Sequence, residues 1–346
     1  MKILHGMSEV AGQGIYTVKG LRENGYETNM VVWRKNIGGY DVDIDLKIGN
    51  QKFKYPVYAA KMACFAIKAL MKYDVYHFHY GYSLIPYHFD LPIIKLLKKD
   101  YYTEFHGSEI RFLFNSIEYE YIKGHWDISE IKKKAQKRLK KLLKDTKGII
   151  LHDVELIKHL PDGIDVPIYI VPLRVDIRRF EPSYSQETEK PIIVHAPSNR
   201  STKGTDQILI ELEKINSEFE LILVEGKTQE EAFEIYKKAD IIIDQISGGT
   251  YGVFAIEGMA LGKPVITYID DEMRDSFPSS LPIVSCQFSD LAQKIDELIK
   301  DSELRYNLGV AGRKYVERYH DNVKVTKFLG EIYDNRIADN NLFKLL

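Results

Sequence analysis

The sequence has few cysteines and no long apolar run. Two of its 346 residues are cysteines. Cys64 and Cys286 lie far apart and match no metal-binding spacing, so we expect neither a disulfide framework nor a cysteine metal site. No apolar segment approaches the roughly 18 residues that a membrane-spanning helix requires. Met1 and Lys2 lead directly into a predicted strand, without the basic and apolar regions of a signal peptide. We therefore expect a cytoplasmic protein.

Neither sign of charge predominates in the chain. There are 48 lysines and arginines against 50 aspartates and glutamates, a formal net charge of −2. This balance gives no overall attraction to nucleic acid, which we do not expect as a partner, so only a local patch of charge would bind a polyanion or a membrane. Hydrophobic content of 45% and charged content of 28% are typical of a globular protein. The length fits two domains of ordinary size.

The start of the chain predicts a βαβ unit of the Rossmann type. It consists of a strand over residues 2–6, a loop with Gly12 and Gly14, a helix over 15–24 and a strand over 28–33. The loop does not have the full G-x-G-x-x-G spacing, so the sequence gives little support to a dinucleotide site. The alternation of acidic and apolar residues over 41–45 is interpreted as an edge strand or loop, rather than as a metal-binding run.

Three histidines lie near the ends of predicted strands. His77 and His79 belong to a strand over residues 75–80, in which alternation places both side chains on one face. Such a pair can bind a metal, but no third ligand is evident nearby, so we interpret the two as hydrogen-bonding residues and expect no metal site. His106 follows a strand over residues 101–105 and precedes a glycine, which suits a group that meets substrate. The other interpretation of His106 is a capping or core histidine.

A strongly basic helix is predicted over residues 131–147. Its apolar residues form one stripe, and its basic residues begin at Lys132 and end at Lys147. One interpretation is a solvated face over a core stripe. The alternative is peripheral contact with an anionic membrane surface, which we would place at the inner face of the membrane.

The second half of the chain repeats the strand and helix pattern of the first. A polar stretch over residues 181–190 is interpreted as the linker, and strands follow over 192–195, 221–224, 241–243 and 265–268. We predict an α/β protein of two Rossmann-like domains that face each other across a cleft. The predicted domains are residues 1–175 and residues 176–320. A final helix over 321–346 packs back toward the first domain.

Two strand ends of the second half carry anion-binding features. Arg200 and Lys203 follow its first strand, and a guanidinium fork with an ammonium near a helix N-terminus suits a diphosphate. A glycine-rich loop over residues 247–252 follows the strand 241–243. Glu257, on the helix after that loop, suits the hydroxyl groups of a ribose. Together these features predict a nucleotide diphosphate site.

Several segments resemble the family-4 glycosyltransferases, which are retaining enzymes of the GT-B fold. Residues 251–266, YGVFAIEGMALGKPVI, are similar to the second half of the E-x7-E region and the EAMA-x-GKPV segment of that family. Residues 236–240 (YKKAD), 171–176 (VPLRVD), 198–204 (SNRSTKG) and 105–109 (FHGSE) resemble its Y-x-x-AD, VPNGVD, phosphate-loop and HGxD segments. The resemblance covers most of the chain.

The resemblance implies a role for each matching residue. Arg200 and Lys203 would hold the donor diphosphate, Glu257 the ribose, and His106 the donor sugar near its reacting carbon. Donor contacts would also come from residues in two glycine loops, namely Gly12, Gly14, Gly249, Thr250, Tyr251 and Gly252. The family requires no divalent metal and no cofactor beyond the nucleotide-sugar substrate. Gly249 stands where the family has the first glutamate of its E-x7-E motif.

We therefore expect a retaining, metal-independent glycosyltransferase. It would move a sugar from a nucleotide-sugar donor to a carbohydrate or lipid-linked acceptor, in polysaccharide or glycoconjugate biosynthesis. Gly249 motivates an alternative, a non-catalytic protein of the same fold that binds nucleotide sugars or glycans. A second alternative is a nucleotide-sugar epimerase, since the same scaffold hosts such enzymes.

Overall fold

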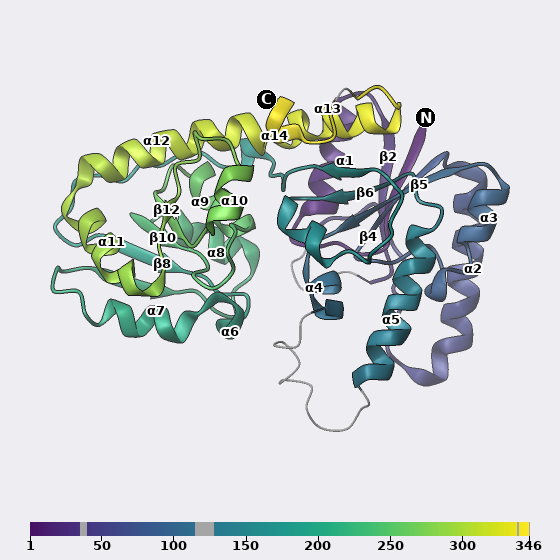
Figure 1. The fold of residues 1–346 in the computed structure, drawn as a ribbon, viewed down its shortest axis with the longest axis horizontal. Coiled ribbons are helices and arrows are strands. Elements are labelled where there is room, and N and C mark those ends of the chain that lie inside the picture. Colours follow the sequence, from purple (N-terminus) through teal and green to yellow (C-terminus); the bar gives the residue numbers. More distant parts are fainter. Residues whose placement is uncertain (35–39, 115–127, 338, 346) are drawn as a thin grey trace. The chain divides into compact units, whose positions relative to one another are not determined.

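A computed structural model describes residues 1–34, 40–114, 128–337 and 339–345. The chain divides into two compact units. The first unit contains Met1–Pro172 together with Val325–Leu345, and the second contains Leu173–Lys324. The end of the chain therefore belongs to the same unit as its beginning (Figure 1).

A parallel seven-stranded sheet forms the centre of the first unit, with the order β3-β2-β1-β4-β5-β6-β7. Its strands are β1 (Lys2–Gly6), β2 (Glu27–Val32), β3 (Ile44–Asp45), β4 (Val75–His79), β5 (Asp100–Phe105), β6 (Gly148–Leu151) and β7 (Ile168–Ile170). The central strands β4 and β6 are buried along their whole length and β5 along nearly all of it; β6 is apolar throughout, whereas β4 and β5 also carry buried polar side chains. The register sets His5 beside His77 and His79 beside Glu104.

Helices cover both faces of this sheet (Figure 1). They are α1 (Gln13–Glu23), α2 (Tyr55–Lys72), α3 (Leu91–Leu96), α4 (Ser108–Phe114), α5 (Ile128–Leu143), α13 (Asn322–Tyr333) and α14 (Leu342–Leu345), with short 3-10 turns η1 (Lys52–Lys54), η2 (Pro86–His88) and η4 (Val154–His159). Leu21 of α1 and Phe328 of α13 share one core cluster with strand residues such as Ile3. On the other face, Tyr76 donates a hydrogen bond to α2 and Tyr101 donates one to α5.

The second unit has a smaller parallel sheet, with the order β12-β11-β10-β8-β9. Its strands are β8 (Ile192–His195), β9 (Glu220–Leu223), β10 (Ile241–Ile243), β11 (Val265–Thr267) and β12 (Val284–Ser285). Its helices are α6 (Arg200–Lys203), α7 (Thr205–Leu212), α8 (Gln229–Tyr236), α9 (Val253–Ala260), α10 (Asp271–Ser276), α11 (Phe288–Lys300) and α12 (Ser302–Tyr319), with the 3-10 turn η5 (Ile177–Arg179). Helix α11 packs on α7, and α12 packs on α9 (Figure 1).

The predicted α/β class with two Rossmann-like units is confirmed, and the final helices pack on the first unit as expected. Two local expectations differ from the structure. Arg200 and Lys203 lie in the short helix α6 rather than in a loop, because Asn199 caps that helix by accepting a hydrogen bond from Thr202 N. The polar stretch over residues 181–190 belongs to the second unit, where buried Ser185 hydrogen-bonds to Asp240 and to buried Arg305.

The described residues contain no helix that is both long and apolar enough to cross a bilayer. Both cysteines are unpaired; Cys64 is exposed and Cys286 is buried.

Candidate functional site

The carboxyl ends of β8 and β10 position the candidate anion site of the second unit. His195, the last residue of β8, is buried, and burial lowers its pKa, which keeps the ring neutral. Its Nδ1 lies 2.8 Å from the Ile243 carbonyl oxygen and its Nε2 lies 2.9 Å from Thr205 Oγ1. A neutral ring that donates to the carbonyl and accepts from the hydroxyl ties β8 to β10 and to the start of α7. The short helix α6 is thereby fixed between these elements.

Lys203 lies at the end of α6 and is held by two side chains that follow β10. Its Nζ donates to Asp244 Oδ1 at 2.6 Å and to Gln245 Oε1 at 3.1 Å. The Lys203 side chain is 13% exposed, and that of Asp244 is fully buried. A buried carboxylate requires a compensating cation, so this pair orients the ammonium as well as neutralising the aspartate.

Asp244 also joins Lys203 to the glycine-rich loop. Its second oxygen, Oδ2, accepts a hydrogen bond of 3.2 Å from the amide of Gly252, the N-cap residue of α9. Gln245 contributes a second link, because its Nε2 donates to the Thr250 carbonyl at 2.5 Å. The structure therefore brings two of the predicted anion-binding features, Lys203 and the loop before α9, to one place at the edge of the sheet.

Arg200 is at the opposite end of α6 and has different partners. Its guanidinium donates to Asp206 at 2.6 Å and to Glu225 at 3.2 Å, and all three side chains are exposed. The hydrogen bonds to these two carboxylates raise the Arg200 pKa. Exposed ion pairs of this kind add little stability and exchange readily with solvent ions. Arg200 can therefore leave Asp206 and Glu225 and turn toward an anionic ligand with little loss of stability.

Glu257 lies on α9 and is partly buried. Burial raises its pKa from 4.5 to about 7, the nearby cation Arg179 opposes the shift, and Asp244 adds to it. A carboxyl group with this pKa changes charge near neutral pH, and residues with such perturbed pKa values gather at functional sites.

Gly249 has a backbone conformation that explains why an acid is absent at this position. Its φ is +69°, and a Cβ atom there would lie 2.8 Å from Asp270 Oδ2. A glutamate at position 249 would combine a left-handed backbone with a steric and electrostatic clash against that carboxylate. Asp270, the N-cap of α10, thus provides a carboxylate close to the place where the family has its first glutamate.

Thr250 and Tyr251 are both buried in the second unit. The Tyr251 hydroxyl lies 3.3 Å from Tyr315 OH and 3.1 Å from His320 Nε2, and its ring packs on Phe277. Through these contacts Tyr251 links the glycine-rich loop to α12 and to His320, the residue that follows α12.

Gly12 and Gly14 lie at the N-terminus of α1 in the first unit. Gly12 has a φ of +83°, and a Cβ at Gly14 would lie 2.7 Å from Glu9 Oε2. The same buried glutamate oxygen accepts a hydrogen bond of 2.8 Å from Ile15 N. A carboxylate therefore already occupies the positive end of α1, where the glycine loop would otherwise receive a phosphate.

His106 follows β5 and is partly buried. Its amide donates to Glu109 Oε1 at 2.5 Å, and its Nε2 lies 3.2 Å from His79 Nδ1. His106 thus belongs to a cluster of histidines at the carboxyl ends of β1, β4 and β5.

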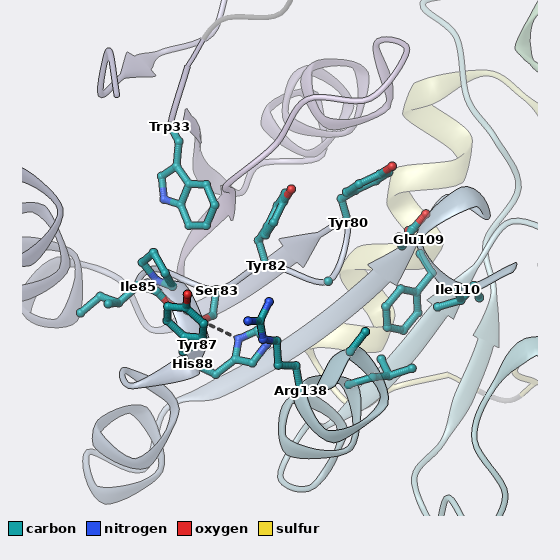
Figure 2. A pocket seen from close by; sticks show the side chains of 15 residues that line it. Trp33, Tyr80, Tyr82, Ser83, Ile85, Tyr87, His88, Glu109, Ile110 and Arg138 are labelled. Atoms are coloured by element: carbon teal, nitrogen blue, oxygen red, sulfur yellow. Dashed lines mark hydrogen bonds between the residues drawn. The ribbon is translucent and has the colours of Figure 1, made fainter. Parts of the chain in front are cut away.

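A cavity of about 320 Å³ opens beside this cluster, after the end of β4. Its walls include the aromatic side chains of Trp33, Tyr80, Tyr82 and Tyr87 (Figure 2). The rings of Trp33 and Tyr82 lie 4.7 Å apart, and Arg138 of α5 lies 4.5 Å from the Tyr87 ring. Burial raises the pKa of the lining residue Glu109 to about 7. Aromatic walls with a few polar groups are typical of sites for small organic ligands.

Sequence reasoning did not identify Asp244, Asp270, Glu9 or this aromatic cavity. Asp244 had a detectable signal, because it directly follows the buried run Ile241–Ile243 and so stands at a strand's carboxyl end. Glu9 and Asp270 had no such signal in the sequence. Their roles depend on contacts that only the fold creates, of Glu9 with Gly14 and Ile15 and of Asp270 with Gly249. The lining residues of the cavity come from four separate parts of the chain, a grouping that only the fold creates.

Comparisons with known proteins identify the fold. No protein-family model matches the chain, and no curated protein matches it. Sucrose-phosphate synthase from Thermosynechococcus elongatus matches with a TM-score of 0.72 at 16% identity, over 96% of this chain and 98% of that one. A glycosyltransferase from Rickettsia africae matches with a TM-score of 0.66 at 16% identity, over 98% and 99%. HepE from Anabaena, in complex with UDP-glucose, matches with a TM-score of 0.65 at 12% identity, over 97% and 100%. The chain therefore has the GT-B fold that the sequence resemblance implies.

The packing at Gly249 predicts an effect on stability. Gly249→Ala should lower the free energy of unfolding by about 1 kcal/mol more than Gly226→Ala. Gly226 also has a positive φ, of +66°, but a Cβ there meets no atom within 4 Å, so it isolates the backbone contribution. Urea unfolding of both variants measures the difference. Equal losses would contradict the proposed clash with Asp270.

The raised pKa of Glu257 predicts a pH-dependent stability. Between its unfolded value of 4.5 and its folded value of about 7, the unfolded chain binds fewer protons at this residue than the folded chain. Stability should therefore fall as pH rises through this window. Replacing the carboxyl group in Glu257→Gln should make the variant more stable than wild type by about 1 to 3 kcal/mol at pH 8, with little difference at pH 4. Urea unfolding at both pH values tests this, and a difference that is independent of pH would refute it.

Proposed function

We propose that this protein is a retaining glycosyltransferase that moves a sugar from a nucleotide-sugar donor to a carbohydrate or lipid-linked acceptor, in polysaccharide or glycoconjugate biosynthesis. The observation that carries the proposal is the linked group of Lys203, Asp244 and Gly252 at the carboxyl ends of β8 and β10. In open α/β sheets, ligands bind at this edge.

The Lys203 ammonium is suited to hold a diphosphate. Within the described part of the chain it donates two hydrogen bonds, to Asp244 and Gln245, which leaves its third N–H for a phosphate oxygen. The N-terminus of α9 adds a positive dipole end, and Arg200 adds a planar guanidinium. Positive groups held in place before the reaction stabilise the charge that develops on the departing diphosphate. No protein nucleophile is assigned, and the leaving phosphate itself acts as base.

Two structural neighbours are consistent with a uridine nucleotide donor. HepE is in complex with UDP-glucose, and the S. aureus protein MnaA, which matches with a TM-score of 0.55 at 13% identity, is a co-structure with UDP. We therefore assign the nucleotide end of such a donor to the second unit. Glu257, in its ionised form, accepts hydrogen bonds from the ribose hydroxyls, and Arg179 stabilises that form.

We assign Asp270, in the second unit, to the sugar end of the donor; for His106, in the first unit, we keep the sugar-contacting role that the resemblance implies. Asp270 lies beside the Gly249 backbone and supplies the carboxylate that position 249 does not have. His106 presents a partly exposed imidazole at the end of β5 in the first unit.

The aromatic cavity of the first unit is assigned to the acceptor. Faces of Trp33 and Tyr82 can stack on a sugar ring or on an apolar lipid chain, while Arg138 and Glu109 offer polar contacts (Figure 2). Glu109, with its pKa near 7, is partly ionised at neutral pH and can then accept a hydrogen bond from an acceptor hydroxyl.

We further propose that the first unit contacts an anionic membrane surface, at the inner face of the membrane in a cytoplasmic enzyme. Large apolar side chains are exposed around α2 and α3: Phe53 is 79% exposed, Met71 74% and Leu96 80%. Helix α5, which covers the same face of the sheet as α2, exposes Lys133, Lys137 and Lys140. The side chain of Lys132 lies outside the described residues. Exposed apolar and basic groups together are typical of surfaces that bind anionic lipid.

The assigned diphosphate site predicts the effect of removing its cations. Arg200→Ala and Lys203→Gln should each reduce UDP-glucose affinity by about 10- to 100-fold, because each removes charged hydrogen bonds to phosphate. Lys203→Gln keeps a donor for buried Asp244. Lys214→Ala is the matched control, since it also breaks a lysine–carboxylate pair of 2.6 Å in the second unit. Calorimetric titration measures the affinities.

A panel of nucleotide sugars tests the reaction itself. Nucleotide release that depends on an acceptor supports the transferase, and retention of the anomeric configuration in the product supports the stated stereochemistry. Thermal stabilisation without release would favour a binding protein, and a rearranged sugar without acceptor would favour an epimerase. If both cation variants keep wild-type turnover, the phosphate site is assigned wrongly.

The membrane proposal predicts a loss of vesicle binding. Replacing Lys133, Lys134 and Lys137 together with glutamine should weaken binding to vesicles of anionic phospholipid by about 100-fold, at about 1 kcal/mol per basic residue. A triple glutamine variant at Lys214, Lys294 and Lys300 of the second unit is the charge-matched control. Sedimentation with vesicles measures both, and equal binding by the two variants would rule out α5 as the contact.

A further inference from the structure

Four histidines and one glutamate meet at the carboxyl ends of β1, β4 and β5. His5, His77, His79 and Glu104 are all buried to 1% exposure or less. His106 is partly exposed and lies next to this group. The cluster arises from the register, since His79 stands beside Glu104 on the neighbouring strand and His106 follows Glu104 by two residues. All five side chains in this group are of types that can ligate a metal ion.

Three atoms of the cluster have the spacing of metal ligands. His79 Nδ1 lies 3.2 Å from His106 Nε2 and 3.4 Å from Glu104 Oε2. All three ligand atoms lie within 4.8 Å of one another. Ligands at about 2.0 Å from a tetrahedral zinc ion are about 3.3 Å apart, so two of the three ligand–ligand distances already have the required length.

We propose that His79, Glu104 and His106 form a binding site for a divalent transition metal, with Zn²⁺ as the preferred ion. Two imidazole nitrogens and one carboxylate oxygen form a donor set of zinc sites that keep a fourth position open for water or substrate. Imidazole also suits other first-row metals, whereas Mg²⁺ and Ca²⁺ prefer oxygen ligands throughout. The sequence predicts no metal site because no third ligand is evident near His77 and His79; in the structure, Glu104 of the neighbouring strand β5 and His106, which follows that strand, lie beside His79.

The remaining members of the cluster fit the role of outer partners. His5 Nδ1 lies 3.2 Å from His79 Nε2, the nitrogen that would not bind the metal. His77 Nε2 lies 2.9 Å from Glu104 Oε2, and His77 Nδ1 in turn contacts the Tyr333 hydroxyl. A hydrogen bond made by the second nitrogen of a ligating histidine, here between His79 and His5, fixes the ligand's orientation and strengthens metal binding.

The charge and access of the site favour this triad over the other combination. His5, His77 and His79 also lie within ligand range of one another, but all three are completely buried and include no carboxylate. The Glu104 carboxylate offsets one of the two charges of a divalent ion, which reduces the cost of burying it. The partly exposed His106 gives the ion a path from solvent.

The test uses the untagged full-length protein and does not depend on the proposed transfer reaction. After treatment with a chelator and addition of Zn²⁺, we expect one zinc per chain by elemental analysis and a higher Tm. Co²⁺ added to the metal-free protein should give the visible absorption of a tetrahedral site with nitrogen and oxygen ligands. Affinity should fall at acidic pH, since histidine ligands must be deprotonated.

Two substitutions decide whether the assigned ligands hold the metal. Glu104→Gln keeps the shape of the side chain and removes its charge, and His106→Gln changes a partly exposed residue with little risk to folding. Each should weaken zinc binding by about 100-fold or more. His159→Gln is the matched control, because His159 is also buried in the first unit and pairs with a carboxylate, Glu155, at 2.7 Å.

The outcomes separate a metal site from a hydrogen-bonded histidine cluster. Stoichiometric zinc that is lost in both ligand variants and kept in the control supports the site. If wild type binds no zinc or cobalt, or if both ligand variants bind as wild type does, the proposal is overturned and the contacts are ordinary hydrogen bonds. Binding of UDP, which has no donor sugar for His106 to contact, should be unchanged in Glu104→Gln, so failure here is distinguishable from failure of the assigned donor site.

Discussion

The buried carboxylate of Asp244 is the constraint on which the second unit's site depends. It lies at the end of a strand that is apolar on both faces, and it is stable there only because Lys203 and the Gly252 amide compensate its charge. One aspartate thereby fixes the direction of a cation, the start of a helix and the path of a glycine loop.

The first unit has different polar groups at the carboxyl ends of its strands. Its glycine loop is closed by an internal acid, Glu9, so the helix end that commonly receives phosphate is already satisfied. Polar function in this unit is concentrated instead at the ends of β4 and β5, where imidazoles, a carboxylate and an aromatic cavity occur together. The two parallel sheets thus carry different side chains at their carboxyl edges. The second unit has Lys203 and Arg200 there, and the first unit has the histidine cluster.

The sequence predicts those features that depend on local pattern. Buried strands such as Ile241–Ile243 and the helix Ser302–Tyr319 follow from periodicity and capping, and Lys203 and Gly252 follow from their positions at strand and helix ends. Features that depend on the approach of distant segments are not predictable in this way. The buried contact between the Tyr251 and Tyr315 hydroxyl groups joins segments 64 residues apart, and Asp270 gains its importance only from its distance to the Gly249 backbone. Part of the recognisable motif is also structural, because a Cβ at Gly262 would meet the ring of Tyr184 at 2.6 Å.

The chain passes from the first unit to the second at Pro172 and returns at Val325. Helix α13 then adds Phe328 and Leu329 to the first core, and Tyr333 to the histidine cluster. During synthesis from the N-terminus, the second unit has all of its residues before the first unit does. Until α13 is synthesised, the first sheet lacks the side chains that this helix adds to the core on one of its faces. The contact between His77 and Tyr333 also forms only after α13 is synthesised, so a chain that stops before α13 would contain the whole group around Asp244 but lack this part of the histidine cluster.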